Sequence, residues 1–170
     1  MPILDIKIFP DPVLREKSKP VTEFNTELHR FLDSLTETMY EAGGVGLAAP
    51  QVGVLKRVAV IDITKEGTEP IEFINPVITV RNGSIPSEEG CLSIPGYREK
   101  IKRNLTVTVE AMNRKGEQFA VNAEDLLAIC LQHEIDHLDG VLFIDHLSRL
   151  KRTLFKQWLK RQMISDLEQK

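Results

Sequence analysis

The chain contains one short run of residues that could bind a metal ion and act on water. Residues 133–137 read His-Glu-Ile-Asp-His, the pattern HExxH. Residues four apart on a helix lie one turn above each other, so His133 and His137 would project from one face and could bind one ion. Glu134 would stand beside them, placed to accept a proton from water. The pattern therefore predicts metal-assisted hydrolysis.

A catalytic site of the zinc type needs a third protein ligand and one open position. The longer metalloprotease pattern HExxHxxGxxH holds through Gly140 but fails at its last position, which is Phe143. This departure disfavours one alternative, a general peptidase. A second alternative, a metal-binding module without catalysis, would close the site with a fourth ligand, and Glu134 as a ready base disfavours it. Three downstream side chains stay open as third ligands: Asp139, Asp145 and His146.

The two cysteines are the other candidates for the third ligand, because two thiols cannot form a disulfide framework. Cys130 lies on the histidine face, but its seven-residue separation from His137 is about 10.5 Å along a helix. Cys91 is the better candidate. It follows Gly90, which lets a backbone approach a site closely, and a thiolate next to a cation is deprotonated.

A third segment, Gly-Val-Gly-Leu-Ala-Ala-Pro-Gln at 44–51, superficially resembles a dinucleotide-binding loop. The GxGxxG pattern fails at Pro50, and the segment follows a predicted helix instead of a strand, so nucleotide binding is rejected. Small residues before one amide side chain suit a backbone that lies close to a ligand and presents Gln51 as a hydrogen-bond donor.

The elements that must position these residues follow from the spacing of apolar side chains. Residues 25–42 repeat them every three or four positions up to Gly43, which predicts an amphipathic helix. Residues 125–138 are apolar on nearly every face, which predicts a buried helix that carries HExxH. A last amphipathic helix should begin near residue 148 and pack on the body through its apolar side, which comprises Leu150, Leu154, Phe155, Trp158 and Leu159.

Between the helices the sequence predicts strands. Residues 57–63 and 72–80 are rich in Val and Ile, and residues 105–111 alternate apolar with polar side chains. The turn at 113–116 predicts a hairpin, and hence antiparallel pairing. The expected class is α+β: antiparallel sheets packed around the buried HExxH helix, with a C-terminal amphipathic helix.

Composition limits the remaining functions. The 170 residues are 42% hydrophobic and 28% charged, and no repeat or linker divides them, which predicts one domain spanning 1–170. The longest apolar run has six residues, far short of a membrane span, and no secretory signal is visible, so we expect a cytoplasmic protein without a membrane partner. A net charge of −3 does not suggest dedicated DNA binding. Residues 149–161 hold six basic and no acidic side chains, which would permit a local contact with an anionic partner.

Three motifs together are far more specific than any one of them. GVGLAAPQ at 44–51, EGCLS at 89–93 and QHEIDH at 132–137 resemble, in this order, the signature motifs of the peptide deformylases. The resemblance covers nearly the whole chain, and the C-terminal helix is similar to that of the bacterial branch typified by Gram-negative enzymes. It implies removal of the formyl group from N-formylmethionine of nascent polypeptides, with release of formate.

The resemblance also implies roles for individual residues. Glu134 would accept the water proton and pass it to the departing amine, while the Gln51 amide and the Leu92 backbone N–H would meet charge on the formyl oxygen. The backbone at Val45 and Gly46 could pair with the substrate as an added strand. Three side chains would hold the metal: Cys91, His133 and His137. The methionine slot would be lined by Val45, the alkyl stem of Arg98, Leu126, Ile129, Cys130 and His133.

The metal and the partners follow from the same resemblance. Two imidazoles and a thiolate fit zinc, but the family resembles ferrous enzymes, so Fe²⁺ is the first choice, with Zn²⁺, Ni²⁺ or Co²⁺ as substitutes. The partners would be N-formylmethionyl nascent peptides. The ribosome would be a further partner, contacted through the basic C-terminal helix.

Overall fold

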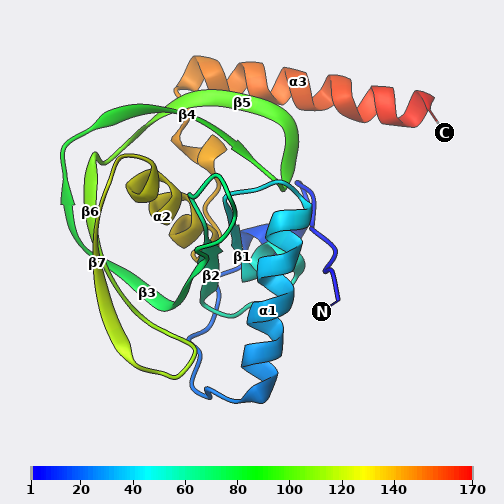
Figure 1. The fold of residues 1–170 in the computed structure, drawn as a ribbon. Helices are drawn as coiled ribbons and strands as arrows, with labels where there is room; N and C mark the ends of the chain where they lie inside the picture. The colour runs from blue at the N-terminus through cyan, green and yellow to red at the C-terminus, as the bar shows by residue number, and fades with distance from the viewer. Residues whose placement is uncertain (1, 170) are drawn as a thin grey trace.

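The structure is a computed structural model and describes residues 2–169. Three α-helices and seven β-strands, joined by short 3₁₀ turns, make up this part of the chain (Figure 1). In chain order they are α1 (Thr26–Glu41), β1 (Gly46–Ala48), β2 (Val58–Ile61), β3 (Ile71–Asn82), β4 (Ile85–Cys91), β5 (Ile94–Arg103), β6 (Thr106–Met112), β7 (Gln118–Glu124), α2 (Asp125–Leu138) and α3 (Arg149–Glu168).

All strand pairs are antiparallel. Five strands form one sheet in the order β1-β2-β3-β6-β7, and β4 pairs with β5 in a separate two-stranded sheet. The short strand β1 lies at one edge of the larger sheet. Figure 1 shows α2 enclosed by the curved strands, α1 beside β1 and β2, and α3 along the outside of the β4–β5 hairpin. The α+β class and the antiparallel pairing predicted from the sequence are confirmed.

The larger sheet is covered on both faces where it approaches α1 and α2. One cluster joins α1 to β2 through residues such as Leu32, Leu35 and Val58, and another joins α2 to β6 through residues such as Leu131 and Val109. All four residues of β2 are therefore buried. A strand covered on both faces reads as a continuous apolar run, which is why the Val/Ile-rich run at 57–63 shows no alternation.

The end of α2 is fixed by close backbone packing. Gly140 adopts φ +72°, and a Cβ at this position would lie 2.4 Å from the carbonyl oxygen of Arg15. Only glycine tolerates both the left-handed backbone and the contact. The helix that carries HExxH therefore stops where the chain turns back against the N-terminal segment.

The C-terminal helix contacts the body through fewer residues than its sequence predicts. Phe155 is 4% exposed and packs against Tyr97 at a ring-centroid distance of 4.8 Å, and Trp158 lies 5.0 Å from the same ring. Leu150 and Leu154, in contrast, are 70% and 49% exposed, so the expectation that both pack on the body is wrong. The helix projects past the sheet (Figure 1), and only the side that faces the aromatic cluster is covered.

The other elements follow the sequence except for β1 and the β4–β5 hairpin, which were not predicted as strands. The three predicted helices and the strands β2, β3, β6 and β7 lie where the apolar patterns place them. The hairpin β4–β5 was not predicted, because its strands alternate buried positions with Glu, Lys and Arg and contain Pro and Gly. No helix between residues 2 and 169 is long and apolar enough to span a bilayer.

The contrast between Phe155 and Leu150 gives a stability prediction. Phe155→Ala should lower the free energy of unfolding by about 3 kcal/mol or more, because it leaves a cavity in the cluster that holds α3. Leu150→Ala should change it by less than about 0.5 kcal/mol, because the side chain is exposed. Urea unfolding of both variants, followed by circular dichroism, measures the difference. Equal losses would show that α3 docks through its whole apolar side.

Candidate functional site

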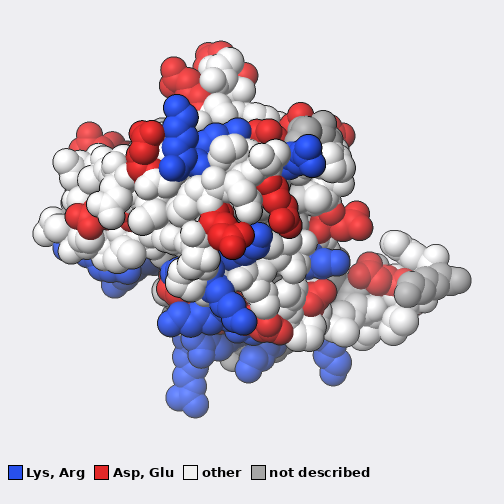
Figure 2. Space-filling view, turned by 90° about the horizontal axis from the view of Figure 1, so that it is seen from below, with Lys and Arg blue, Asp and Glu red and all other residues white. Residues whose placement is uncertain are grey.

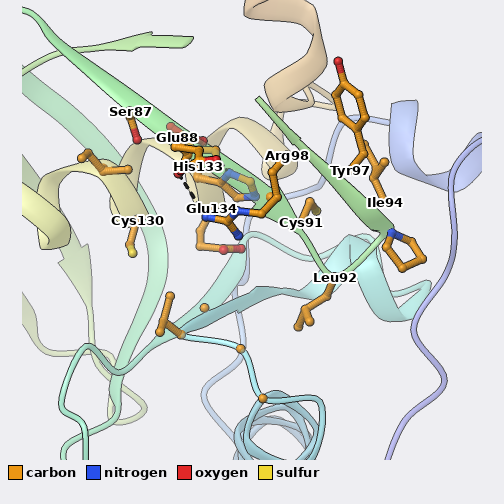
Figure 3. Close-up of a pocket in the computed structure, with 18 of the residues that line it drawn as sticks. Ser87, Glu88, Cys91, Leu92, Ile94, Tyr97, Arg98, Cys130, His133 and Glu134 are labelled. Carbon is orange, nitrogen blue, oxygen red and sulfur yellow. Dashed lines mark hydrogen bonds and ion pairs between the residues drawn. The ribbon is translucent and has the colours of Figure 1, made fainter. Parts of the chain in front are cut away.

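The three sequence motifs meet in one cavity of about 860 Å³. It lies between α2, the β4–β5 hairpin and the β1 edge of the larger sheet (Figure 3). Nearly all predicted site residues line it: Val45, Gly46, Gln51, Cys91, Leu92, Arg98, Leu126, Ile129, Cys130, His133 and Glu134. The exception is His137, which is 1% exposed and lies behind the cavity wall.

Three donor atoms converge at the base of this cavity. The Sγ of Cys91 lies 3.4 Å from Nε2 of His137, and that nitrogen lies 3.3 Å from Nε2 of His133. The donor atoms of these three residues all fall within 4.8 Å of one another. The helix supplies the two imidazoles one turn apart, and the end of β4 supplies the thiol.

These separations fit a bound metal ion. Two nitrogens about 2.05 Å from an ion and at the tetrahedral angle lie about 3.3 Å apart, and a nitrogen and a thiolate sulfur lie about 3.5 Å apart. His133 presents Nε2 because its Nδ1 contacts Glu89 Oε1 at 2.9 Å, the usual arrangement behind a metal-bound imidazole. The donor set therefore fits a divalent metal.

The titration of the two imidazoles is coupled. Burial lowers the pKa of His137 well below its usual value, and the neighbouring His133 lowers it further. Burial also acts to lower the pKa of His133, but hydrogen bonds with Cys91 and Glu89 outweigh it and raise this pKa to about 10. A proton on His133 Nε2 must leave when that nitrogen coordinates a cation, so metal binding is linked to pH.

The alternative third ligands lie elsewhere. Asp139 pairs with Arg57 at 2.9 Å, and Asp145 pairs with Arg15. His146 contacts Asp136 through Nε2 at 2.9 Å. Cys130 lines the cavity but does not belong to the three-donor cluster. Among the candidates that the sequence leaves open, the structure brings only Cys91 to the two imidazoles.

Glu134 is a buried carboxyl group beside the donor cluster. Burial raises its pKa to about 7. Its Oε2 has no hydrogen-bond partner within residues 2–169. A carboxyl group with a pKa near neutrality can accept a proton and return it in one reaction cycle, which is the property of a general base and acid.

Gly46 explains why the first motif consists of small residues. A Cβ at position 46 would lie 2.6 Å from Oε1 of Glu134, and a Cβ at Gly44 would lie 2.7 Å from Cδ1 of Leu92. The backbone of β1 thus passes directly against the carboxylate. The sequence predicts that this segment lies close to a ligand; within the chain, the group that it approaches is Glu134.

Gln51 is 1% exposed and held at both ends of its amide. Its Oε1 accepts from the Ala48 backbone N–H at 3.0 Å, which fixes the orientation of the group. Its Nε2 donates to Ser93 Oγ at 3.2 Å and contacts Cys91 Sγ at 3.5 Å. The amide donor is therefore directed at the metal-binding cluster.

A buried ion network behind the site was missed by sequence reasoning. Arg103 donates to both carboxylate oxygens of Glu89, at 2.8 and 2.9 Å, and to Asp136 at 2.7 Å. Burial alone would raise the pKa of Glu89, but hydrogen bonds from Arg103 and His133 lower it to about 2. The available signal was the two-residue period of β4, which puts Glu89 on the same side as Cys91.

The fold and the site are those of a metal-dependent hydrolase: an α+β protein has a buried HExxH helix, a β-hairpin that brings a thiol to the two imidazoles, and an open cavity in front. Comparison with known proteins gives the family. The profile described as "Polypeptide deformylase" matches residues 3–153. The peptide deformylase of Thermodesulfovibrio yellowstonii is 50% identical over 162 residues, 94% of this chain and 98% of that protein.

Two further similar proteins are also peptide deformylases. The peptide deformylase of Rhizobium meliloti is 54% identical over 158 residues, 91% of this chain and 90% of that protein. The crystal structure of a peptide deformylase from Legionella pneumophila superposes with a TM-score of 0.91 at 44% identity and covers 98% of both chains. The chain belongs to the peptide deformylase family, whose enzymes depend on a metal and remove N-terminal formyl groups from nascent polypeptides.

The contact between Gly46 and Glu134 gives a prediction for activity. Gly46→Ala should reduce kcat/KM for a formylmethionyl peptide by about tenfold or more, because the new methyl group must displace the carboxylate. Gly116→Ala is the matched control: it introduces a methyl group at φ +80° in a turn outside the cavity, so it should reduce stability without this loss of rate. Initial rates of amine release from both folded variants measure the effect. If Gly46→Ala and Gly116→Ala released amine at similar rates, the close packing of Gly46 against Glu134 would not be needed for catalysis.

Proposed function

We propose that the cavity described above deformylates N-formylmethionyl peptides with one divalent ion held by Cys91, His133 and His137. The observation that carries this proposal is the convergence of Sγ and two Nε2 atoms beside the buried Glu134 carboxyl group. The reaction is proposed to take place in the cytoplasm, where formylated chains emerge from the ribosome.

The proposed native ion is Fe²⁺. The support is the similarity to ferrous deformylases, while the imidazole and thiolate donors also suit Zn²⁺, Ni²⁺ and Co²⁺ as substitutes. When bound, such an ion polarises a carbonyl oxygen and makes water acidic enough to supply a nucleophile near neutral pH. Glu89 would keep His133 in the tautomer that presents Nε2 to the ion.

Glu134 would move the proton. Its carboxylate lies beside the ligands and against the β1 backbone, so water and a scissile formamide held there would both be within reach. It would take a proton from water and deliver it to the amine nitrogen as the C–N bond breaks. General acid and base catalysis of this kind contributes about 10²- to 10⁴-fold in rate.

Two donors would stabilise charge on the formyl oxygen. The Gln51 amide is fixed by the Ala48 N–H and directed at the cluster, and the Leu92 backbone N–H follows the Cys91 ligand in the chain. Groups held in place before the reaction need no reorganisation when charge develops. Loss of one such donor typically costs about 2.7 to 4 kcal/mol of transition-state stabilisation.

The methionine side chain would enter the slot formed by the cavity wall. Leu126, Ile129 and Cys130 line it from α2, and Arg98 lies across Gly90 from β5, where a Cβ would approach its Nη1 to 2.9 Å. The peptide would continue along Val45 and Gly46, because β1 is an edge strand. An edge strand offers backbone donors and acceptors to an added strand.

The proposed roles predict that loss of the bound metal and loss of the reaction rate can be separated by substitution. Glu134→Ala should keep about one metal ion per chain but deformylate a formyl-Met peptide about 10²- to 10⁴-fold more slowly. Cys91→Ser should lose most of the metal together with activity, while Cys130→Ser should keep the metal. Elemental analysis of anaerobically purified protein and amine release measure both properties, with an acetyl-Met peptide as the unreactive control. Metal loss in Glu134→Ala would make that residue a ligand.

We also propose that the basic side chains of α3 dock on the ribosome. Of the six between residues 149 and 161, Lys151 is half-buried and pairs with Glu99 at 3.1 Å, whereas the other five are exposed. Figure 2 is seen from the side away from α3 and shows basic and acidic side chains on that face, with several Lys and Arg side chains along its lower edge. A projecting cationic helix suits ribosomal phosphates, whose contacts weaken by about 0.7 to 0.9 log units per log unit of salt for each phosphate.

Charge reversal tests this docking without disturbing Phe155, which a truncation of α3 would remove. The variant Lys156→Glu, Lys160→Glu and Arg161→Glu should lose co-sedimentation with ribosomes at low salt while still deformylating a short formyl-Met peptide. The control variant makes the same charge change at three exposed positions away from α3: Lys17→Glu, Lys65→Glu and Lys115→Glu. Equal loss in both variants would mean that overall charge, and not α3, mediates binding.

A further inference from the structure

One polar side chain in the wall of the slot has no place in the chemistry described so far. Ser87 lies on β4, and the two-residue period of the strand puts it on the same side as Glu89. It is 7% exposed and lines the cavity. Figure 3 shows it on the wall above Cys130, away from Leu92 at the other end of the cavity.

The surroundings of Ser87 differ from those of its neighbour on the strand. Glu89 is fully engaged by Arg103 and His133. The Ser87 hydroxyl, in contrast, makes no hydrogen bond to any of residues 2–169. The hydroxyl faces the cavity, where it can exchange a bond with water for a bond with an acceptor that a ligand brings into the slot.

The group that would enter this slot is the first side chain of the substrate. A methionine thioether is a weak acceptor, and its sulfoxide oxygen is a much better one. Norleucine has nearly the same length and shape but offers no acceptor. Apolar groups of α2 such as Leu126 and Ile129 also line the slot, and these discriminate by size and not by polarity.

We propose that the Ser87 hydroxyl is a specificity-determining donor, which hydrogen-bonds the side-chain sulfur of the first residue and, more strongly, the oxygen of its sulfoxide. The enzyme then accepts peptides that begin with formylmethionine sulfoxide, which a wholly apolar slot would reject. This inference rests on the proposed function, because it assigns the slot to the first side chain.

The Cys130 thiol, which lines the slot from α2, acts in the same direction but more weakly. Burial raises the pKa of the Cys130 thiol to about 12, so it stays protonated near neutral pH. A thiol is a poor donor compared with a hydroxyl. Of these two residues, Ser87 is therefore the one whose removal should change selectivity more.

The test compares three formylated peptides that differ only in the first residue: methionine, methionine sulfoxide and norleucine. The metal-loaded enzyme should deformylate all three. In Ser87→Ala the ratio of kcat/KM for sulfoxide over norleucine should fall about fivefold or more, the equivalent of about 1 kcal/mol for one lost hydrogen bond. Ser87→Thr keeps a hydroxyl in a residue suited to a strand and should retain the ratio to a greater degree.

Ser18→Ala is the matched control, because Ser18 is also buried, lies outside the cavity and has a hydroxyl without a partner within the described chain. It should leave the ratio unchanged. Turnover of formyl-Met with no turnover of the sulfoxide, or an unchanged ratio in folded Ser87→Ala, would overturn the role of Ser87 and leave the proposed function intact. No turnover of formyl-Met by the metal-loaded enzyme would instead contradict the proposed function.

Discussion

This structure depends on the burial of a helix, α2, in which five of six successive residues have polar or ionisable side chains. Between Gln132 and His137 only Ile135 is apolar, yet α2 is enclosed by strands. Buried polar groups are costly unless they are paired, so each of these side chains requires a partner from a different element. Gln132 meets the backbone of Asn104, and Asp136 meets Arg103. The remaining three side chains belong to the site.

The β4–β5 hairpin supplies most of those partners. Cys91 comes from the end of β4, Glu89 comes from the same side of that strand, and Arg103 ends β5. Arg103 binds two carboxylates from different elements, so the hairpin cannot slide along α2 without separating opposite charges in a buried place. A buried ion network is weak evidence for stability, but it defines a position well. Here the defined position is that of His133, through Glu89.

The reaction type and the elements with apolar patterns could be predicted from the sequence, but the β4–β5 hairpin could not. HExxH on an apolar segment predicts its own helix, and β2, β6 and β7 follow from runs of Val and Ile or from alternation. In β4 the inward positions Ser87, Glu89 and Cys91 are polar because they face a site and not a core, so the alternation carries no apolar signal. The prediction for Leu150 was wrong for the opposite reason. The apolar spacing on α3 predicts that one whole side of the helix packs on the body, whereas only the residues near Tyr97 are covered.

The same arrangement explains why a formyl group at a chain end suits this cavity. Val45 and Leu126 at the opening are 47% and 48% exposed, so a bound peptide would cover apolar surface that the free enzyme leaves in water. Deeper in, the Gly46 backbone and the Glu134 carboxylate are so close that even a Cβ would not fit between them. Formyl is the smallest acyl group, with a hydrogen where an internal peptide bond carries a Cα. The apolar opening therefore suits the peptide side of a formylated chain end, and the tight packing beside Glu134 suits a small acyl group.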